Sequence, residues 1–119
     1  MAKEELIKKT INDETAVIAT GKILDNNNAF EMVSAITELQ EKNFKYIVID
    51  MNNLEFISSA GVGSILGTVE NSREDGGDII LCNLSQNVLH IFEVLDLVDF
   101  LTIKTSNEDV SKVCGVEIS

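Results

Sequence analysis

The segment that most restricts the fold of this chain is residues 46–66, where an apolar run leads through a polar loop into a helical pattern. The run from Tyr46 to Ile49 is continuous and β-branched, as is typical of a strand that is covered on both faces. From Val62 onward, apolar residues recur at the spacing of an amphipathic helix. A buried strand that leads into a helix in this way indicates an α/β fold.

Two serines, Ser58 and Ser59, lie at the junction between the polar loop and this helix. A serine at the start of a helix can accept a hydrogen bond from an unpaired backbone N–H group, so either residue can be the cap. The same position is the positive end of the helix dipole, where a phosphate group would meet N–H donors. The pattern is therefore compatible with capping and with phosphorylation, and one site can serve both.

Strands and helices are predicted to alternate along the rest of the chain. Strands 5–11 and 15–20 are expected to form a hairpin across the turn Asn12–Glu14. Further strands are predicted at 46–51, 79–82 and 100–103, and helices at 28–42, at 60–74, after a Ser85 cap, and from Ser106 to Gly115. For the first helix, Asn28 and Glu31 have the spacing of a capping box. Such strand–helix–strand units require right-handed crossovers between parallel strands.

Helical spacing also predicts which side chains face the core. These are Phe30, Val33, Ile36 and Leu39 in the first helix, and Val88, Ile91, Phe92 and Leu95 in the third. If every crossover steps the same way, all the helices lie on one face of the sheet. The apolar run 46–49, however, indicates a strand covered on both faces, so a flavodoxin-like arrangement remains the alternative.

Length and charge restrict the kind of protein and partner. With 119 residues the chain is expected to be one domain, residues 1–119. Its 20 acidic and 9 basic residues give a net charge of −11, which repels nucleic acids and anionic membranes. The charge favours a protein partner with a basic or neutral surface, although it is equally explained by solubility. No run approaches the ~20 apolar residues of a membrane span, and the first residues do not resemble a signal peptide, so a cytoplasmic protein is expected.

Catalytic, nucleotide-binding and metal sites are poorly supported by the sequence. Ile57 precedes Ser59 by two positions, so the Gly-x-Ser-x-Gly elbow of a hydrolase is absent, and His90 is predicted to face solvent from another helix. The glycines within the helix, Gly61, Gly63 and Gly67, indicate close packing rather than a phosphate loop. No cofactor and no metal site are predicted, although Asp25 and Asp50 leave weak cation binding open. Cys82 and Cys114 are expected to be free thiols.

The segment Leu54-Glu-Phe-Ile-Ser-Ser-Ala-Gly-Val-Gly63 resembles the signature of STAS domains (sulphate transporter and anti-sigma factor antagonist). Residues 21–29, Gly-Lys-Ile-Leu-Asp-Asn-Asn-Asn-Ala, resemble a second landmark of that family. The resemblance implies an α/β, STAS-like single domain with a mixed, mostly parallel sheet of four to five strands and about four helices. Ser59 stands at the phosphorylated position of the family, while Ser58 replaces a frequent aspartate and is the second choice.

By resemblance, the chain is an anti-sigma factor antagonist and not an enzyme. When unphosphorylated it would bind an anti-sigma factor serine kinase and free the sigma factor. The kinase would use ATP and Mg²⁺ to phosphorylate Ser59, and a serine phosphatase would reverse this. The surface implied for partner binding comprises Asp25, Asn26, Ser58, Ala60, Gly61, Val62 and Gly63. Two alternatives remain, a STAS module of a scaffold or transport complex that is not phosphorylated, and a small phosphate-handling enzyme.

Overall fold

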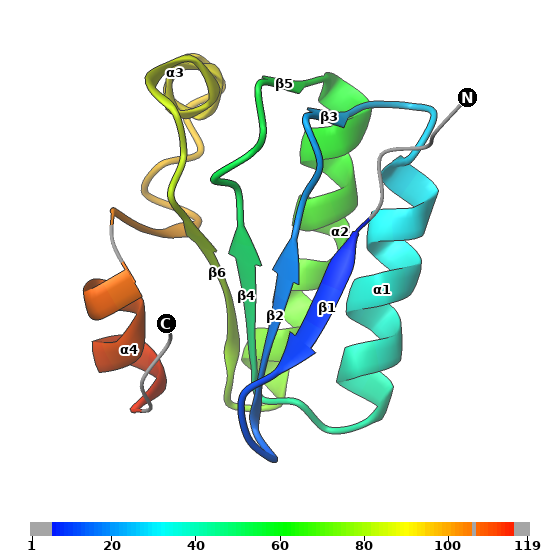
Figure 1. Cartoon of the computed structure of the whole chain (residues 1–119), viewed down its shortest axis with the longest axis vertical. Helices are drawn as coiled ribbons and strands as arrows, with labels where there is room; N and C mark the ends of the chain where they lie inside the picture. Colours follow the sequence, from blue (N-terminus) through cyan, green and yellow to red (C-terminus); the bar gives the residue numbers. More distant parts are fainter. Residues whose placement is uncertain (1–5, 106, 116–119) are drawn as a thin grey trace.

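Five strands form the main sheet, in the spatial order β1-β2-β4-β6-β7 (Figure 1). The computed structural model describes residues 6–105 and 107–115. The strands are β1 (Ile7–Thr10), β2 (Thr15–Ala19), β4 (Tyr46–Asp50), β6 (Asp78–Cys82) and β7 (Thr102–Lys104). β1 and β2 form the predicted antiparallel hairpin, and the other neighbours in this sheet are parallel. The mixed, mostly parallel sheet predicted from the sequence is confirmed.

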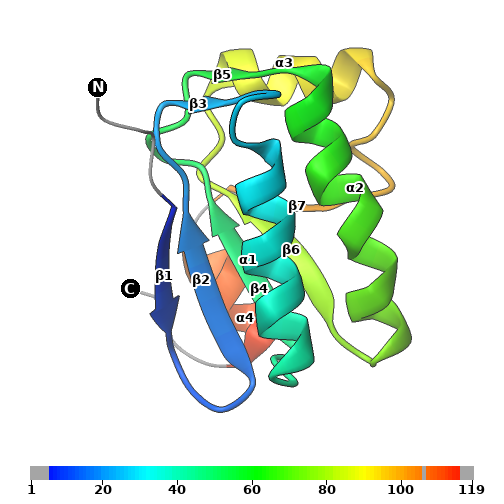
Figure 2. The same ribbon diagram turned by 90° about the vertical axis from the view of Figure 1, so that its right-hand side faces the viewer.

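Helices cover the two faces of this sheet unequally. The described helices are α1 (Ala29–Glu41), α2 (Ser59–Glu74), α3 (Gln86–Val94) and α4 (Asn107–Cys114). Figure 2 shows α1 and α2 side by side on one face and α4 on the opposite face. Because β2, β4, β6 and β7 are adjacent in chain order, the sheet winds in one direction. The flavodoxin-like alternative is therefore wrong.

The position of α4 explains why β4 is apolar on both faces. Successive side chains of a strand point to opposite faces, so Ile47 and Ile49 enter the main core with the buried residues of α1 and α2. Val48 points the other way, into a smaller buried cluster with Ile80 and Val110 of α4. One-way winding is thus compatible with a strand that is buried on both sides.

A second, smaller sheet was not predicted as strand structure. It pairs β3 (Ile23–Leu24) with β5 (Phe56–Ile57) in parallel, and it lies at the end of the molecule where α2 begins (Figure 1). Each strand has only two residues, too few to show a periodic pattern in the sequence. This pair joins the loop that follows β2 to the loop that precedes the serines.

Three of the described helices, α1, α2 and α3, end in the same hydrogen-bonded turn. In each, a residue with positive φ follows the helix, and the next N–H group donates back to a carbonyl in the last turn. The positive-φ residues are Asn43, Gly76 and Asp96, and the closing bonds are Phe44 to Leu39, Gly77 to Ser72 and Leu97 to Phe92. Gly115, also with positive φ, follows α4 as predicted, while Ser106 lies outside the described residues.

Some predicted core positions are wrong. In α1, Phe30 is 79% exposed and Val33 is only half-buried, whereas Ile36 and Leu39 are buried as predicted, together with Met32 and Ala35. Leu95, at the C-cap of α3, is also exposed. The predicted strand 100–103 is observed as β7 at Thr102–Lys104, so Phe100 precedes it. Among the described residues, none of the helices has both the length and the apolar character needed to cross a bilayer.

Candidate functional site

Ser58 is the N-cap of α2. Its extended backbone (φ −95°, ψ 174°) places its Oγ 3.3 Å from the backbone nitrogen of Gly61, from which it accepts a hydrogen bond. The N–H of Ser58 donates to the carbonyl of Leu24 in β3 at 2.9 Å. Ser58 is half-buried by these contacts. Its hydroxyl and backbone therefore serve the local structure, as one of the two predicted roles requires.

Ser59, the first residue of α2, is in a different environment. Its side chain is exposed, and its hydroxyl has no hydrogen-bond partner within the part of the chain that the structure describes. It lies at the positive end of a helix of 16 residues, whose first-turn N–H groups are not used by the helix itself. The structure thus divides the two roles between the serines, with Ser58 as the cap and Ser59 as the accessible hydroxyl.

Gly61 is required for the close approach of α2 to the small sheet. A Cβ atom at this position would lie 2.5 Å from the carbonyl oxygen of Leu24 and 2.8 Å from Cγ1 of Ile57. Gly63 is different, because an added Cβ would have no atom within 4 Å. Close packing within the domain therefore explains Gly61 but not Gly63, which faces open space beside the serines.

The predicted partner-binding set is divided by burial. Gly61 and Val62 are buried, so they pack inside the domain at the start of α2 and do not reach the surface. Ala60 and Gly63 are exposed on α2. The surface that remains around the serines is therefore smaller than the predicted one, and the side chains that α2 contributes to it are small.

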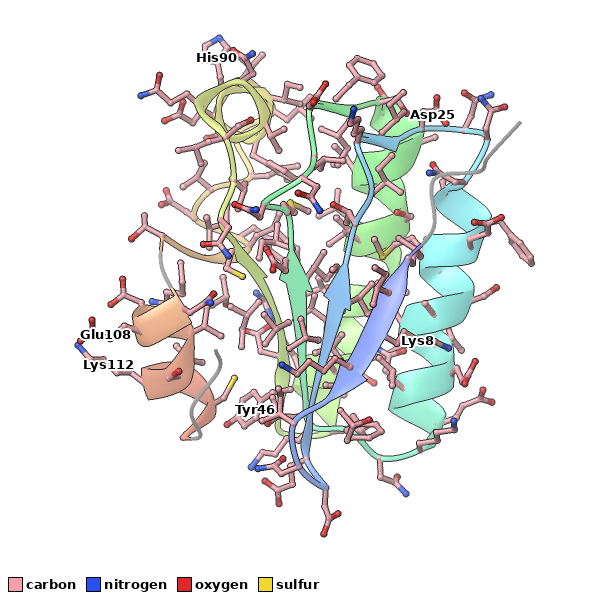
Figure 3. All side chains as sticks on the ribbon, in the orientation of Figure 1. Lys8, Asp25, Tyr46, His90, Glu108 and Lys112 are labelled. Atoms are coloured by element: carbon pink, nitrogen blue, oxygen red, sulfur yellow. The ribbon has the colours of Figure 1, made fainter. Side chains whose placement is uncertain are left out.

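The Asp25 loop is fixed beside the start of α2, as Figure 3 shows. The carboxylate of Asp25 accepts from the N–H of Asn27 at 2.9 Å, while the side chain of Asn28 accepts from the N–H of Asp25 at 2.8 Å. Asn28 also donates to the carbonyl of Ile23. The predicted capping box is wrong, because Asn28 is the N-cap of α1 but its side chain holds the loop instead of the helix. Asn26 is exposed at the tip.

Exposed apolar side chains border this surface, and they were not among the predicted site residues. Ile23 and Phe56 are cross-strand neighbours in the small sheet, and both are exposed. Phe30 is exposed on the first turn of α1, which follows the Asp25 loop. The sequence did not mark Phe56 as exposed, because its opposition to the buried Ile57 follows only once β5 is known to be a strand. Apolar and aromatic side chains at a surface are typical of protein interfaces.

The side chains considered for catalysis or metal binding are either exposed elsewhere or used in local hydrogen bonds. As predicted, His90 is exposed on the outer side of α3 (Figure 3). Its Nδ1 lies 3.7 Å from a carboxylate oxygen of Glu93. The carboxylates of Asp25 and Asp50 are each used locally, Asp50 by Asn52 and Asn83. Among the described residues, no group of three or more His, Cys, Asp or Glu side chains is placed to hold a metal ion.

A polar depression lies at the same end of the molecule but does not include the serines. It measures about 960 Å³ and is lined by Gly21, Lys22, Asn52, Asn53, Leu54, Glu55, Ser85 and Asn87. Ser85 is already the cap of α3, accepting from the N–H of Val88. The lining is rich in amides, and neither serine of the junction faces it.

The fold and the serine junction together define the class of protein. The family model of the STAS domain matches residues 7–110, and the chain belongs to this family. Among the relatives, BtrV of Bordetella bronchiseptica, named as a candidate anti-sigma factor antagonist, is 26% identical over 86 residues, which are 72% of this chain and 74% of that protein. The anti-sigma-B factor antagonist of Staphylococcus aureus is 21% identical over 102 residues, covering 86% and 94%.

Comparison with solved structures shows the same fold. The anti-sigma factor antagonist SpoIIAA in its unphosphorylated form superposes with a TM-score of 0.80 at 25% identity, over 94% of this chain and 98% of that one. The phosphorylated form, described as a Bacillus cell fate determinant, gives 0.71 at 24% identity, over 92% and 99%. The fold of this chain is the STAS fold, as predicted.

Proposed function

We propose that this chain is an anti-sigma factor antagonist whose binding is controlled by phosphorylation of Ser59. The observation that carries the proposal is the division of roles at the start of α2, where Ser58 caps the helix and the hydroxyl of Ser59 is exposed. The names of the relatives support it, and SpoIIAA has been described in both phosphorylation states. The unphosphorylated chain binds an anti-sigma factor, which is also a serine kinase, and so frees a sigma factor. A serine phosphatase restores this form.

The proposed binding surface follows from exposure. It consists of Asp25, Asn26, Ser59, Ala60 and Gly63, and it is bordered by the apolar side chains of Ile23, Phe30 and Phe56. The small residues on α2 let a partner backbone approach closely, and the apolar border supplies burial. Because the proposed partners regulate transcription, the proposal implies a cytoplasmic protein that is a substrate rather than an enzyme.

The switch is electrostatic in this proposal. A phosphoserine adds a charge of about −1.5 to −2, which the N-terminus of α2 accommodates with its dipole and N–H groups. The same charge inside an interface would be buried without a partner, beside the carboxylate of Asp25, in a chain that already carries −11. Phosphorylation is therefore expected to release the partner while the antagonist stays folded.

A direct test incubates the purified chain with extract of the source cells, ATP and Mg²⁺, and measures the intact mass. One added phosphate is expected, and Ser59→Ala should prevent it. Ser58→Ala is the matched control, since it removes the neighbouring hydroxyl and should reduce phosphorylation only partly, through a looser helix start. Phosphopeptide sequencing that places the phosphate on Ser58 would contradict the assignment of the acceptor.

The same experiment separates the two alternatives. Stable binding to a partner without phosphate transfer would indicate a STAS module of a scaffold or transport complex. Turnover of a small phosphoester by the chain alone would indicate an enzyme. Either result would replace the proposed function.

A further inference from the structure

Four large apolar side chains are exposed close together after α3, on a segment distinct from the serine surface. Val94, Leu95, Val98 and Phe100 are 68%, 46%, 37% and 40% exposed. We call this set the α3–β7 patch, since it runs from the last residue of α3 to the residues before β7. Single exposed apolar residues are ordinary, but four within seven positions form a surface of the kind that binds other proteins.

The backbone beneath this patch is fixed by hydrogen bonds and packing. The turn that ends α3 is closed by the bond from Leu97 to Phe92 at 3.0 Å. Leu97 packs against the main core, and the N–H groups of Phe100 and Leu101 both donate to its carbonyl. Leu101 is buried. The apolar side chains are therefore presented by an ordered segment that is anchored on both sides.

Phe100 is further held by the end of α2. The guanidinium carbon of Arg73 lies 4.9 Å from the centroid of the Phe100 ring, and its Nη2 donates to the carbonyl of Phe100 at 2.7 Å. Arg73 also forms an ion pair with Asp78 at 3.0 Å. The positive charge nearest the patch is thus engaged within the domain and is compensated by a carboxylate.

Acidic residues separate the apolar ones. Glu93, Asp96 and Asp99 recur every third residue along the segment, and all three are exposed. Between Arg73 and Lys104 the sequence contains six acidic residues and no lysine or arginine. The patch therefore combines exposed apolar side chains with acidic ones that alternate with them along the segment.

We propose that the α3–β7 patch is a docking surface for a protein segment with apolar side chains flanked by lysine or arginine, such as a basic amphipathic helix. Such a segment would bury its apolar face on the patch while its cations meet Glu93, Asp96 and Asp99. A second copy of this chain is a poor occupant, because the same acidic residues would face each other. Phosphorylation of Ser59 adds no charge to this segment, so this docking is independent of the proposed switch.

A synthetic amphipathic helical peptide of leucine and lysine is a suitable probe, added to the whole ¹⁵N-labelled chain while amide shifts are recorded. Saturable binding is expected, with the largest shifts at residues 93–100. Val94→Ser combined with Val98→Ser should weaken binding by about tenfold, since central apolar contacts carry most interface energy. Ile7→Ser removes an equally exposed apolar side chain from β1 and should leave the affinity unchanged.

Several outcomes would overturn the proposal. One is equal binding of a peptide with glutamate in place of lysine, and another is unchanged affinity in the double variant. Amide shifts spread over the whole acidic surface, or binding that does not saturate at about 1 mM peptide, would also contradict the proposal. Concentration-dependent dimers that Val94→Ser removes would assign the patch to a second copy instead. Because Ser59 takes no part in this docking, these results neither support nor contradict the proposed phosphorylation, which is tested separately.

Discussion

The backbone N–H of Ser58 donates to the carbonyl oxygen of Leu24 at 2.9 Å, and this bond joins the start of α2 to the strand that precedes Asp25. Each residue is followed directly by a proposed functional residue, Ser59 and Asp25 respectively. The same Leu24 carbonyl lies against Gly61. One carbonyl group therefore sets the position of the proposed acceptor serine relative to the acidic loop.

This contact predicts opposite effects for two glycine substitutions in α2. Gly61→Ala would place a methyl group 2.5 Å from the Leu24 oxygen, so the helix start must shift, and we expect a loss of about 1–3 kcal/mol in the free energy of unfolding. Gly63→Ala meets open space and improves helix propensity, so a gain of about 0.5–1 kcal/mol is expected. Urea denaturation measures both. Equal stability of the two variants would show that the contact with Leu24 does not restrict position 61.

The two serines should differ in their effect on stability. Ser58→Ala removes the hydroxyl that caps α2 and should cost about 1 kcal/mol, whereas Ser59→Ala should change stability by no more than about 0.5 kcal/mol. Thermal unfolding followed by circular dichroism measures the difference. If the Ser59 variant were the less stable one, the assignment of the cap would be wrong.

A charge at position 59 should leave the fold unchanged. Ser59→Glu carries about half the charge of a phosphate, at a helix end that favours negative groups. We therefore expect amide shifts confined to the Asp25 loop and the start of α2, together with weaker binding of the anti-sigma factor. Ser59→Gln is the neutral control of matched size and should bind more tightly than the glutamate variant. Shifts that reach β7 would indicate remodelling rather than local repulsion.

Both thiols should react slowly in the folded chain. Burial raises the pKa of Cys82 to about 12 and that of Cys114 to about 11, and the thiolate is the reactive form. At pH 8 the folded chain should therefore be alkylated by iodoacetamide much more slowly than the chain in urea, with Cys82 the slower of the two. When the pH is raised from 8 to 10, the alkylation rate of the unfolded chain should approach a plateau, because its thiols ionise near pH 9. The alkylation rate of the folded chain should keep rising over the same range. Rapid native labelling of Cys82 at pH 8 would contradict its burial.

The sequence predicts the long periodic elements well and the short ones poorly. The strand at 46–49 is marked by a continuous β-branched run, and the helix from Val62 by apolar residues at helical spacing. Both elements were predicted to within a residue or two. β3 and β5 have two residues each, and their stability comes from pairing with one another, which no local pattern reveals. Phe30 was misplaced because its spacing to Val33 fits a helix face that tertiary packing rotates toward Met32.

At the candidate site, the sequence predicts which residues take part but not which of the two serines caps the helix. Ser58 and Ser59 are equivalent as local signals for a cap, and only the extended backbone of Ser58 decides which hydroxyl is used by the helix. Gly61 was open to packing within the domain or to contact with a partner, and the carbonyl of Leu24 decides for packing. The second answer depends on a contact between Gly61 and Leu24, which are more than thirty residues apart in the sequence.

The edge strand β1 has features that disfavour pairing with a strand of another molecule. A strand at the border of a sheet exposes unpaired backbone groups that can recruit further strands into aggregates. β1 is only four residues long, exposed throughout, and carries Lys8 and Lys9 at its centre. Lys8 is tied to Glu38 of α1 at 3.3 Å, which holds a charge across this border. At this edge, the short and charged β1 therefore disfavours the addition of a further strand.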